Sequence, residues 1–138
     1  MTEITALKAD PGHPSRVEVF LDGRLWRAVP AAAAAGLHVG MSLDAAAQQA
    51  IEDRSSEAAA LERVGRLLVI RPRSEAEVRQ RLKRAGHARE TTDRVIDRLR
   101  HSGDLDDGAF ARAWVENRMT FRPRGAAMLR AELRRKGV

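Results

Sequence analysis

The side chains best suited to bind something are basic, and they recur in pairs four residues apart. Arg79 and Lys83 form one pair, and Arg130 and Arg134 form the other. Residues four apart share a face of a helix, so each pair would present two cations together. Such cations bind phosphates or carboxylates. The competing interpretation is a solvated helix face, on which the cations pair with nearby acids: Glu75, Glu77 and Glu132.

The balance of charge is uneven along the chain. The sequence of 138 residues has 25 Lys and Arg against 19 Asp and Glu, a net charge of +6. Residues 1–56 hold five basic and seven acidic side chains, whereas residues 57–138 hold 20 and 12. A GC-rich genome could explain the excess of Arg over Lys, but not this asymmetry, which indicates a polyanion or an acidic protein surface as partner.

The candidate contact residues for a partner or for DNA are the basic residues of the repeated segments and their lead-ins: Arg71, Arg73, Arg79, Lys83, Arg118, Arg122, Arg124, Arg130 and Arg134.

No arrangement of residues indicates an enzyme, a metal site or a cofactor. The four histidines lack metal-ligand spacing, and there is no glycine-rich phosphate loop. Asp106 and Asp107 precede an expected helix, which favours N-capping over metal binding. Phe110 and Trp114 fall on the expected inward face, which favours a core role over base stacking. The absence of cysteine fits a reducing compartment, and the residue pattern leads us to expect neither a secretory signal nor a membrane span.

The first part of the chain is expected to form strands. Apolar and polar residues alternate over residues 16–21, and Asp22 with Gly23 then predicts a type I′ hairpin turn. Residues 24–29 would form the returning strand, and residues 4–8 a third.

Two helices should complete this first part. A short helix should follow from Pro30 to Gly36, and a longer one, capped by Ser42 or Asp44, should run to about Arg54. Residues 53–56 would then mark a boundary between the first part and the rest.

From residue 57 onward the pattern is helical throughout. Ser74 and Glu77 form a capping box, and Gly86 and Gly103 are expected to end helices. The expected helices cover approximately residues 57–71, 74–86, 89–101, 106–122 (ended by Pro123) and 125–136. Their expected inward residues are Ala60, Val64, Leu67, Leu68, Val78, Leu82, Val95, Leu99, Phe110, Ala113, Trp114, Leu129 and Leu133.

An internal repeat organises this helical part. Residues 71–87 match residues 122–138 at a shift of 51, sharing an Arg-Pro-Arg lead-in and a terminal glycine. A period near 50 with three helices in each unit is typical of a helical array. We therefore expect a mainly α protein of tandem three-helix repeats, preceded by a small β-hairpin or three-stranded sheet module. The expected divisions are residues 1–56, 57–103 and 104–138, the last an incomplete repeat that would leave an apolar face exposed.

Three stretches together resemble the RecX family of bacterial regulatory proteins. They are RPRSEAEVRQRLKRAG at 71–86, VIDRLRHSGDLDDGAFARAWVENR at 95–118 and RPRGAAMLRAELRRKGV at 122–138. The signature residues of the middle stretch are Leu105, Asp106, Asp107, Phe110, Ala111, Trp114 and Arg118. Leu82 of the first stretch and Leu133 of the third occupy equivalent positions in the repeat.

The resemblance implies a right-handed array of three-helix units, usually three. It also implies binding of RecA and of the RecA–single-stranded-DNA filament, restraint of ATP hydrolysis and strand exchange, and in some members direct DNA binding. We expect a cytoplasmic monomer without catalytic activity. Two alternatives stay open: a DNA-binding helical protein that needs no RecA, and a structural adaptor for another protein.

Overall fold

The computed structural model describes residues 2–121 and 124–138. Its contacts divide the chain into two compact units, residues 1–59 and 60–138. The division falls inside helix α2 (Ala45–Ile70), which supplies residues to both units.

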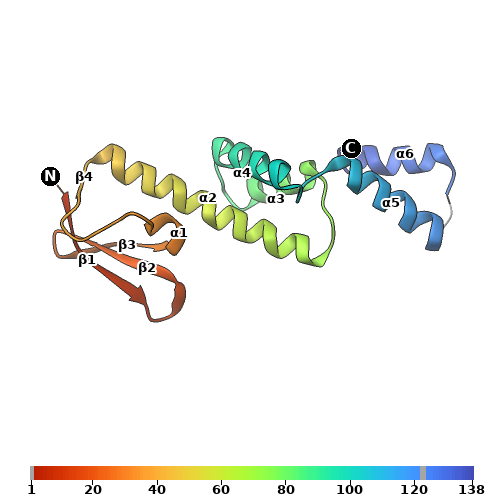
Figure 1. Ribbon diagram of the computed structural model, residues 1–138. Coiled ribbons are helices and arrows are strands. Elements are labelled where there is room, and N and C mark those ends of the chain that lie inside the picture. Colours follow the sequence, from red (N-terminus) through yellow and green to blue (C-terminus); the bar gives the residue numbers. More distant parts are fainter. Residues whose placement is uncertain (1, 122–123) are drawn as a thin grey trace. The chain divides into compact units, whose positions relative to one another are not determined.

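The first unit is built on a four-stranded antiparallel sheet. Its strands are β1 (Thr2–Asp10), β2 (His13–Leu21), β3 (Arg24–Pro30) and β4 (Ser42–Leu43), in the order β3-β2-β1-β4 (Figure 1). Asp22 and Gly23 have φ values of 51° and 80°, which confirms the predicted hairpin turn, since a type I′ turn needs positive φ at both positions.

Helices α1 (Ala31–Ala34) and α2 cover one face of this sheet. The core joins residues from the strands, from α1 and from the start of α2: Ile4, Val19, Leu21, Val29, Ala33, Leu43 and Ile51. The Asp44 carboxylate accepts a hydrogen bond from the Ala47 backbone N–H (2.7 Å), so Asp44, one of the two predicted caps, begins α2.

Two features of the first unit differ from the prediction. The short strand β4, which pairs with the start of β1, was not expected. The predicted helix end at Arg54 is wrong, because α2 continues without a break to Ile70. Ser55 lies inside the helix, where its hydroxyl donates to the Ile51 carbonyl one turn earlier (2.8 Å).

The second unit is helical. After the last turns of α2 come α3 (Glu75–Arg84), α4 (Arg89–Ser102), α5 (Asp107–Phe121) and α6 (Ala126–Arg135) (Figure 1). The end of α2 packs with α3 and α4 around a core to which each helix contributes: Ala60, Val64, Val78, Leu82, Val95, Ile96, Leu99 and Leu105. Of the inward residues predicted for these three helices, Ala60, Val64, Val78, Leu82, Val95 and Leu99 are confirmed as members of this core. Leu68 is only partly buried against it, and Leu67 is buried outside it.

The two repeats match in backbone geometry. Helices α3 and α6 are both ten residues long, and the start and end of α6 each lie 51 residues after those of α3. Each helix ends at a glycine of positive φ, 89° at Gly86 and 82° at Gly137. In each, the next backbone N–H donates to the carbonyl of Leu82 (3.1 Å) or Leu133 (3.0 Å). Both helices therefore have a Schellman ending, and the helix end predicted at Gly86 is confirmed.

The inward face of α5 is rotated relative to the prediction, since Ala111 and Val115 are half-buried. Phe110 is buried and Trp114 is half-buried, but Ala113 is exposed. A residue four positions along a helix returns close to the same side, whereas one three positions along falls at the edge of the stripe. The side chain of Phe121 and the predicted stop at Pro123 lie outside the described residues.

Within residues 2–121 and 124–138, no helix combines the length and the apolarity needed to cross a bilayer. The same residues contain no cluster of three or more acidic or histidine side chains that could hold a metal ion.

Candidate partner-binding surface

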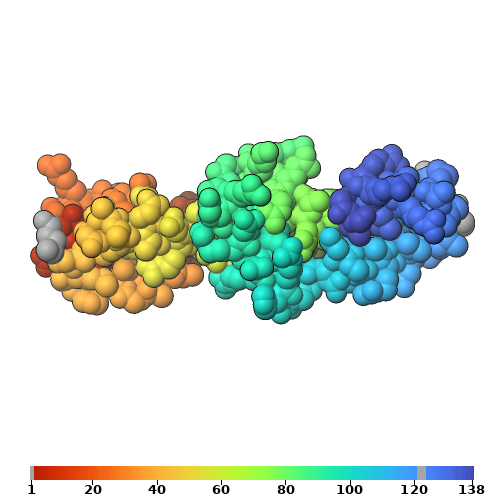
Figure 2. Space-filling view, turned by 90° about the horizontal axis from the view of Figure 1, so that it is seen from above, coloured from red at the N-terminus to blue at the C-terminus, as the bar shows by residue number. Residues whose placement is uncertain are grey.

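Helix α3 carries the first predicted basic pair, and its N-terminus is held firmly. The Ser74 hydroxyl accepts from the Glu77 N–H (3.2 Å), and the Glu77 carboxylate accepts from the Ser74 N–H (3.3 Å), which confirms the capping box. Ser74 is fully buried, and its hydroxyl also donates to the Lys136 carbonyl (2.6 Å) at the end of the second repeat. In Figure 2 the last residues of the chain, in dark blue, lie against the green residues of the first repeat.

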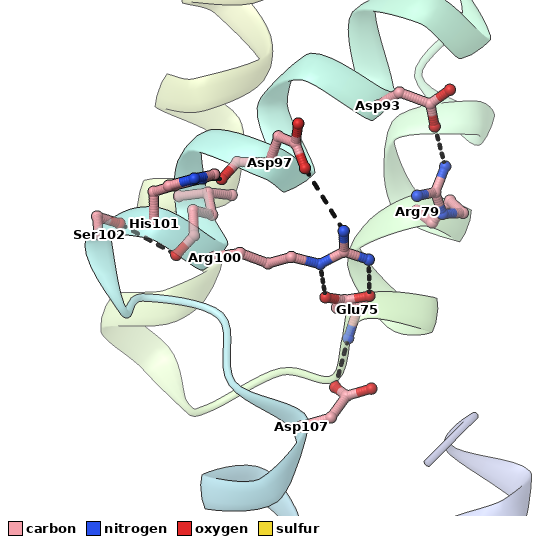
Figure 3. Close-up of polar contacts among 9 residues, drawn as sticks. Glu75, Arg79, Asp93, Asp97, Arg100, His101, Ser102 and Asp107 are labelled. Carbon is pink, nitrogen blue, oxygen red and sulfur yellow. Dashed lines mark hydrogen bonds and ion pairs between the residues drawn. The ribbon is translucent and has the colours of Figure 1, made fainter.

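Asp106 and Asp107 both serve as helix caps. Asp106 accepts from the Ala109 N–H (3.0 Å), the predicted role at the start of α5. Asp107 reaches α3, where its carboxylate accepts from the Glu75 N–H (3.0 Å; Figure 3). This adjacent acidic pair therefore orients the starts of two helices, one in each repeat.

A two-point ion pair joins α3 to α4. The Arg100 guanidinium donates to both carboxylate oxygens of Glu75, one of these bonds being 2.7 Å long (Figure 3). The hydrogen bond from Arg100 lowers the pKa of Glu75, and the same bond raises the pKa of Arg100. Sequence spacing gave no sign of this pair, because its members are 25 positions apart on different helices.

The predicted pair of Arg79 and Lys83 borders a groove between α3 and α4. The groove has a volume of about 770 Å³, and Arg89 and Asp93 also line it. Arg79 donates to Asp93 across the groove (2.5 Å; Figure 3), so much of its charge is neutralised. Lys83 is exposed, and no ion pair of it is found within the described part of the chain.

Arg71 is a structural cation. It donates to Glu77 (2.6 Å), and Lys136 lies 3.8 Å from the same carboxylate. Burial alone would raise the pKa of Glu77, but the hydrogen bonds from Arg71 and from the Ser74 backbone, with the charges of Arg71 and Lys136, outweigh it and lower the pKa. Arg71 therefore links the end of α2 to α3.

Arg118 and Arg124 converge on one buried acid. Arg118 donates to Glu132 (3.1 Å), and the Arg124 Nε lies 3.4 Å from the other oxygen of that carboxylate, outside hydrogen-bond geometry. The Glu132 side chain is only 10% exposed. Arg118 also lies over the Trp114 ring, and Lys136 lies over the same ring, at 4.5 and 5.4 Å from its centre.

The remaining candidates divide by exposure. Arg130 and Arg134 are exposed on α6, and no ion pair of either occurs among the residues described. Arg73 is half-buried, and Arg122 lies outside the described residues. The cations most available to a partner are thus Lys83, Arg130 and Arg134. Sequence reasoning passed over three further exposed cations at the ends of α3 and α6: Arg81, Arg84 and Arg135.

Known proteins match this architecture. A family model for the first three-helix domain of RecX matches residues 60–99, and one for the second three-helix domain matches residues 106–138. A crystal structure of regulatory protein RecX superposes on the whole chain with a TM-score of 0.86 and 25% sequence identity, with 68% of that protein covered.

Curated relatives give the same family. Regulatory protein RecX of Mycobacteroides abscessus is 44% identical over 73 residues, which is 53% of this chain and 36% of that protein. That of Mycolicibacterium smegmatis is 38% identical over 91 residues, 66% of this chain and 48% of the relative. That of Prosthecochloris aestuarii is 44% identical over 79 residues, 57% of this chain and 52% of the relative. The chain thus spans between a third and about half of the length of these relatives.

The two family models together cover more than half of the chain, and the matching relatives and fold carry the same name. This chain belongs to the RecX family of regulatory proteins.

Proposed function

We propose that this chain is a non-catalytic regulator that binds RecA and the RecA–single-stranded-DNA filament in the cytoplasm, and restrains ATP hydrolysis and strand exchange. Family membership supports a regulatory role. The observation that carries the proposed binding is the recurrence of an exposed cation at one position of the repeat, Lys83 on α3 and Arg134 on α6.

A repeated cation suits a repeated partner. A RecA filament on DNA offers the same acidic groups and phosphates at regular intervals, so cations fixed on successive repeats can engage successive sites. Each exposed contact is weak alone, and the repeat adds such contacts within one chain. Binding of this kind weakens steeply as salt is added.

The test is retention on RecA filaments assembled on immobilised single-stranded DNA. Lys83→Glu combined with Arg134→Glu should reduce retention about tenfold or more at low salt and leave the helical circular dichroism unchanged. The matched control is Arg16→Glu with Arg24→Glu, which makes the same change of net charge on exposed positions of the first unit.

Two results would overturn this assignment. Equal loss in the test and control pairs would mean that net charge alone governs retention. Equal retention on naked DNA and on filaments would favour the alternative of a DNA-binding protein that needs no RecA. Arg79 is left out of the test because its substitution would also break the ion pair with Asp93.

A further inference from the structure

A small basic pocket lies where the end of α2 meets α3. Its volume is about 190 Å³, and half of its lining residues are arginines: Arg71, Arg73, Arg81 and Arg84. Glu77, the one acid in the lining, is already engaged by Arg71 and Lys136. Three guanidinium groups of the lining therefore have no carboxylate partner within the described chain.

Arg73 is a cation that its surroundings leave poorly satisfied. Its Nε is shielded from solvent and has no hydrogen-bond partner among the described residues. Burial lowers the pKa of Arg73, and the neighbouring positive charges of Arg71 and Arg81 lower it further, against the opposing effect of Glu77. A guanidinium stays charged under these conditions, so the protein carries the cost of a partly desolvated, unpaired cation.

The second repeat shows how the same place can be neutralised. At a shift of 51, Arg124 corresponds to Arg73, and Glu132 corresponds to Arg81. In the second repeat the Glu132 carboxylate is buried between Arg124 and Arg118. In the first repeat the side chain equivalent to Glu132 is the cation Arg81. Arg73 and Arg81 therefore line an open pocket, whereas the equivalent place in the second repeat is filled by the Glu132 carboxylate.

We propose that the pocket of Arg73, Arg81 and Arg84 binds a phosphoryl group, which takes the place that the Glu132 carboxylate occupies in the second repeat. The group can be a phosphodiester of single-stranded DNA or a small phosphate compound, and both present anionic oxygens arranged tetrahedrally around phosphorus to the guanidiniums. The pocket needs no RecA, so its test can succeed or fail separately from that of the proposed function.

The number of donors favours phosphate over carboxylate. In the second repeat, two arginines flank one carboxylate: Arg118 donates to one oxygen, and Arg124 lies within ion-pair distance of the other. The first repeat offers three guanidiniums after Arg71 is assigned to Glu77. Each guanidinium presents up to five N–H donors in a planar fork. The oxygens of a phosphoryl group are arranged tetrahedrally and can accept from guanidiniums that lie in different planes, whereas the two oxygens of a carboxylate lie in one plane.

The sharpest test replaces Arg81 of the first repeat with the glutamate found at the equivalent position of the second repeat, Glu132. Arg81→Glu should let the protein's own carboxylate neutralise Arg73, so the thermal midpoint in chloride should stay the same or rise. The matched control is Arg112→Glu, which makes the same charge change at an exposed position on α5 outside the pocket. Thermal unfolding of the full chain is measured in inorganic phosphate, acetate and chloride at equal ionic strength.

The expected result is that phosphate raises the midpoint of the unsubstituted chain and of Arg112→Glu above that in chloride, and that Arg81→Glu loses this rise. The apparent affinity for phosphate should fall about tenfold or more in Arg81→Glu. A phosphate effect no larger than that of chloride, or an equal loss in the two variants, would overturn the proposal. Stabilisation by acetate without a matching effect of phosphate would also overturn it, in favour of an acidic protein side chain.

A labelled thymidine oligonucleotide identifies the source of the phosphoryl group. Weaker oligonucleotide binding in Arg81→Glu than in Arg112→Glu would assign the pocket to the DNA backbone. A phosphate effect with equal oligonucleotide binding in both variants would assign it to a small phosphate compound. Arg84→Gln is the second pocket variant, since its exposed position at the end of α3 lets the test proceed if Arg81→Glu does not fold.

Discussion

At the scale of single residues, the acids decide what each arginine can do. Arg118 and Arg124 are held by the buried Glu132, and Arg71 is held by Glu77. These cations fix one helix against another and are unavailable to a partner. Lys83 and Arg134 have no such acid within the described chain, which leaves their charges for binding.

Removing the buried acid of the second repeat should therefore destabilise the protein. Glu132→Gln leaves Arg118 and Arg124 partly buried without a counter-charge, and we expect it to lower the free energy of unfolding by roughly 2–4 kcal/mol. Urea unfolding measures this loss. Glu62→Gln is the control, because its ion pair with Arg66 lies on an exposed helix face and should contribute about 0.5 kcal/mol or less. Equal losses in the two variants would contradict the structural role given to Glu132.

The lowered pKa of Glu77 predicts a dependence of stability on pH. A carboxyl group with a lower pKa in the folded state binds fewer protons there than in the unfolded state, so its stabilisation is present above its ordinary pKa, near 4.5, and is lost as pH falls below it. The free energy of unfolding should therefore decrease below about pH 5. Glu77→Gln should lower stability at neutral pH and make this decrease shallower. Urea titrations at a series of pH values measure both effects, and an unchanged slope in the variant would refute the assignment.

The sequence is enough to propose candidate cations, but it does not separate those that pair with acids inside the protein from those available to a partner. Spacing along a helix identifies residues that share a face, such as Arg79 and Lys83. Such spacing does not reveal an acidic partner on another helix. Asp93 lies 14 positions after Arg79, and Glu132 lies 14 positions after Arg118. The role of each arginine depends on how helices pack, and local periodicity does not encode that.

Among the helices, the two repeats share the backbone conformation of their helix ends but differ in the side chains that surround those ends. Gly86 and Gly137 adopt the same left-handed conformation after α3 and α6, but their surroundings differ. A Cβ at Gly86 would meet open space, whereas one at Gly137 would lie 2.3 Å from the Cβ of Ala76. The second glycine therefore serves both a turn and a close contact between the repeats.

These two glycines give a matched pair of substitutions. Both Gly86→Ala and Gly137→Ala should lose about 1–2 kcal/mol of stability from the left-handed backbone. Gly137→Ala should lose a further 1 kcal/mol or so, because the new methyl group overlaps Ala76. Urea unfolding compares them. Measured against Ala76→Gly alone, which carries its own helix cost, the extra loss of Gly137→Ala should disappear and the loss of Gly86→Ala should be unchanged, and the opposite pattern would rule out the contact.

Element boundaries show where sequence patterns succeed and where they fail. The capping box at Ser74 and the glycine ends were predictable because each is a local signal with a specific geometry. The continuity of α2 was missed because Ser55 and Ser56 are common at boundaries, yet Ser55 satisfies its hydroxyl within the helix. Strand β4 was missed because two residues carry no periodicity, and only pairing with β1 defines the strand.

At the scale of the whole molecule, two hydrophobic cores form from separate sets of residues. The first core takes Ile51 from α2, and the second takes Ala60 and Val64 from the same helix. The two tryptophans of the chain are divided in the same way, with Trp26 packed against the first core and Trp114 in the second unit. Each unit thus contains its own fluorescent reporter.

Separate cores predict that damage to one unit is felt mainly in that unit. Val19 is fully buried in the first core, so Val19→Ala should lower the stability of the first unit by about 2 kcal/mol. Two single-tryptophan backgrounds, Trp114→Phe and Trp26→Phe, let fluorescence in urea follow each unit alone. The unfolding transition reported by Trp26 should move to a lower urea concentration. The free energy of unfolding obtained from Trp114 should change by less than about 0.5 kcal/mol. Equal shifts of both transitions would instead show that α2 couples the units into one cooperative fold, since it is the helix that supplies both cores.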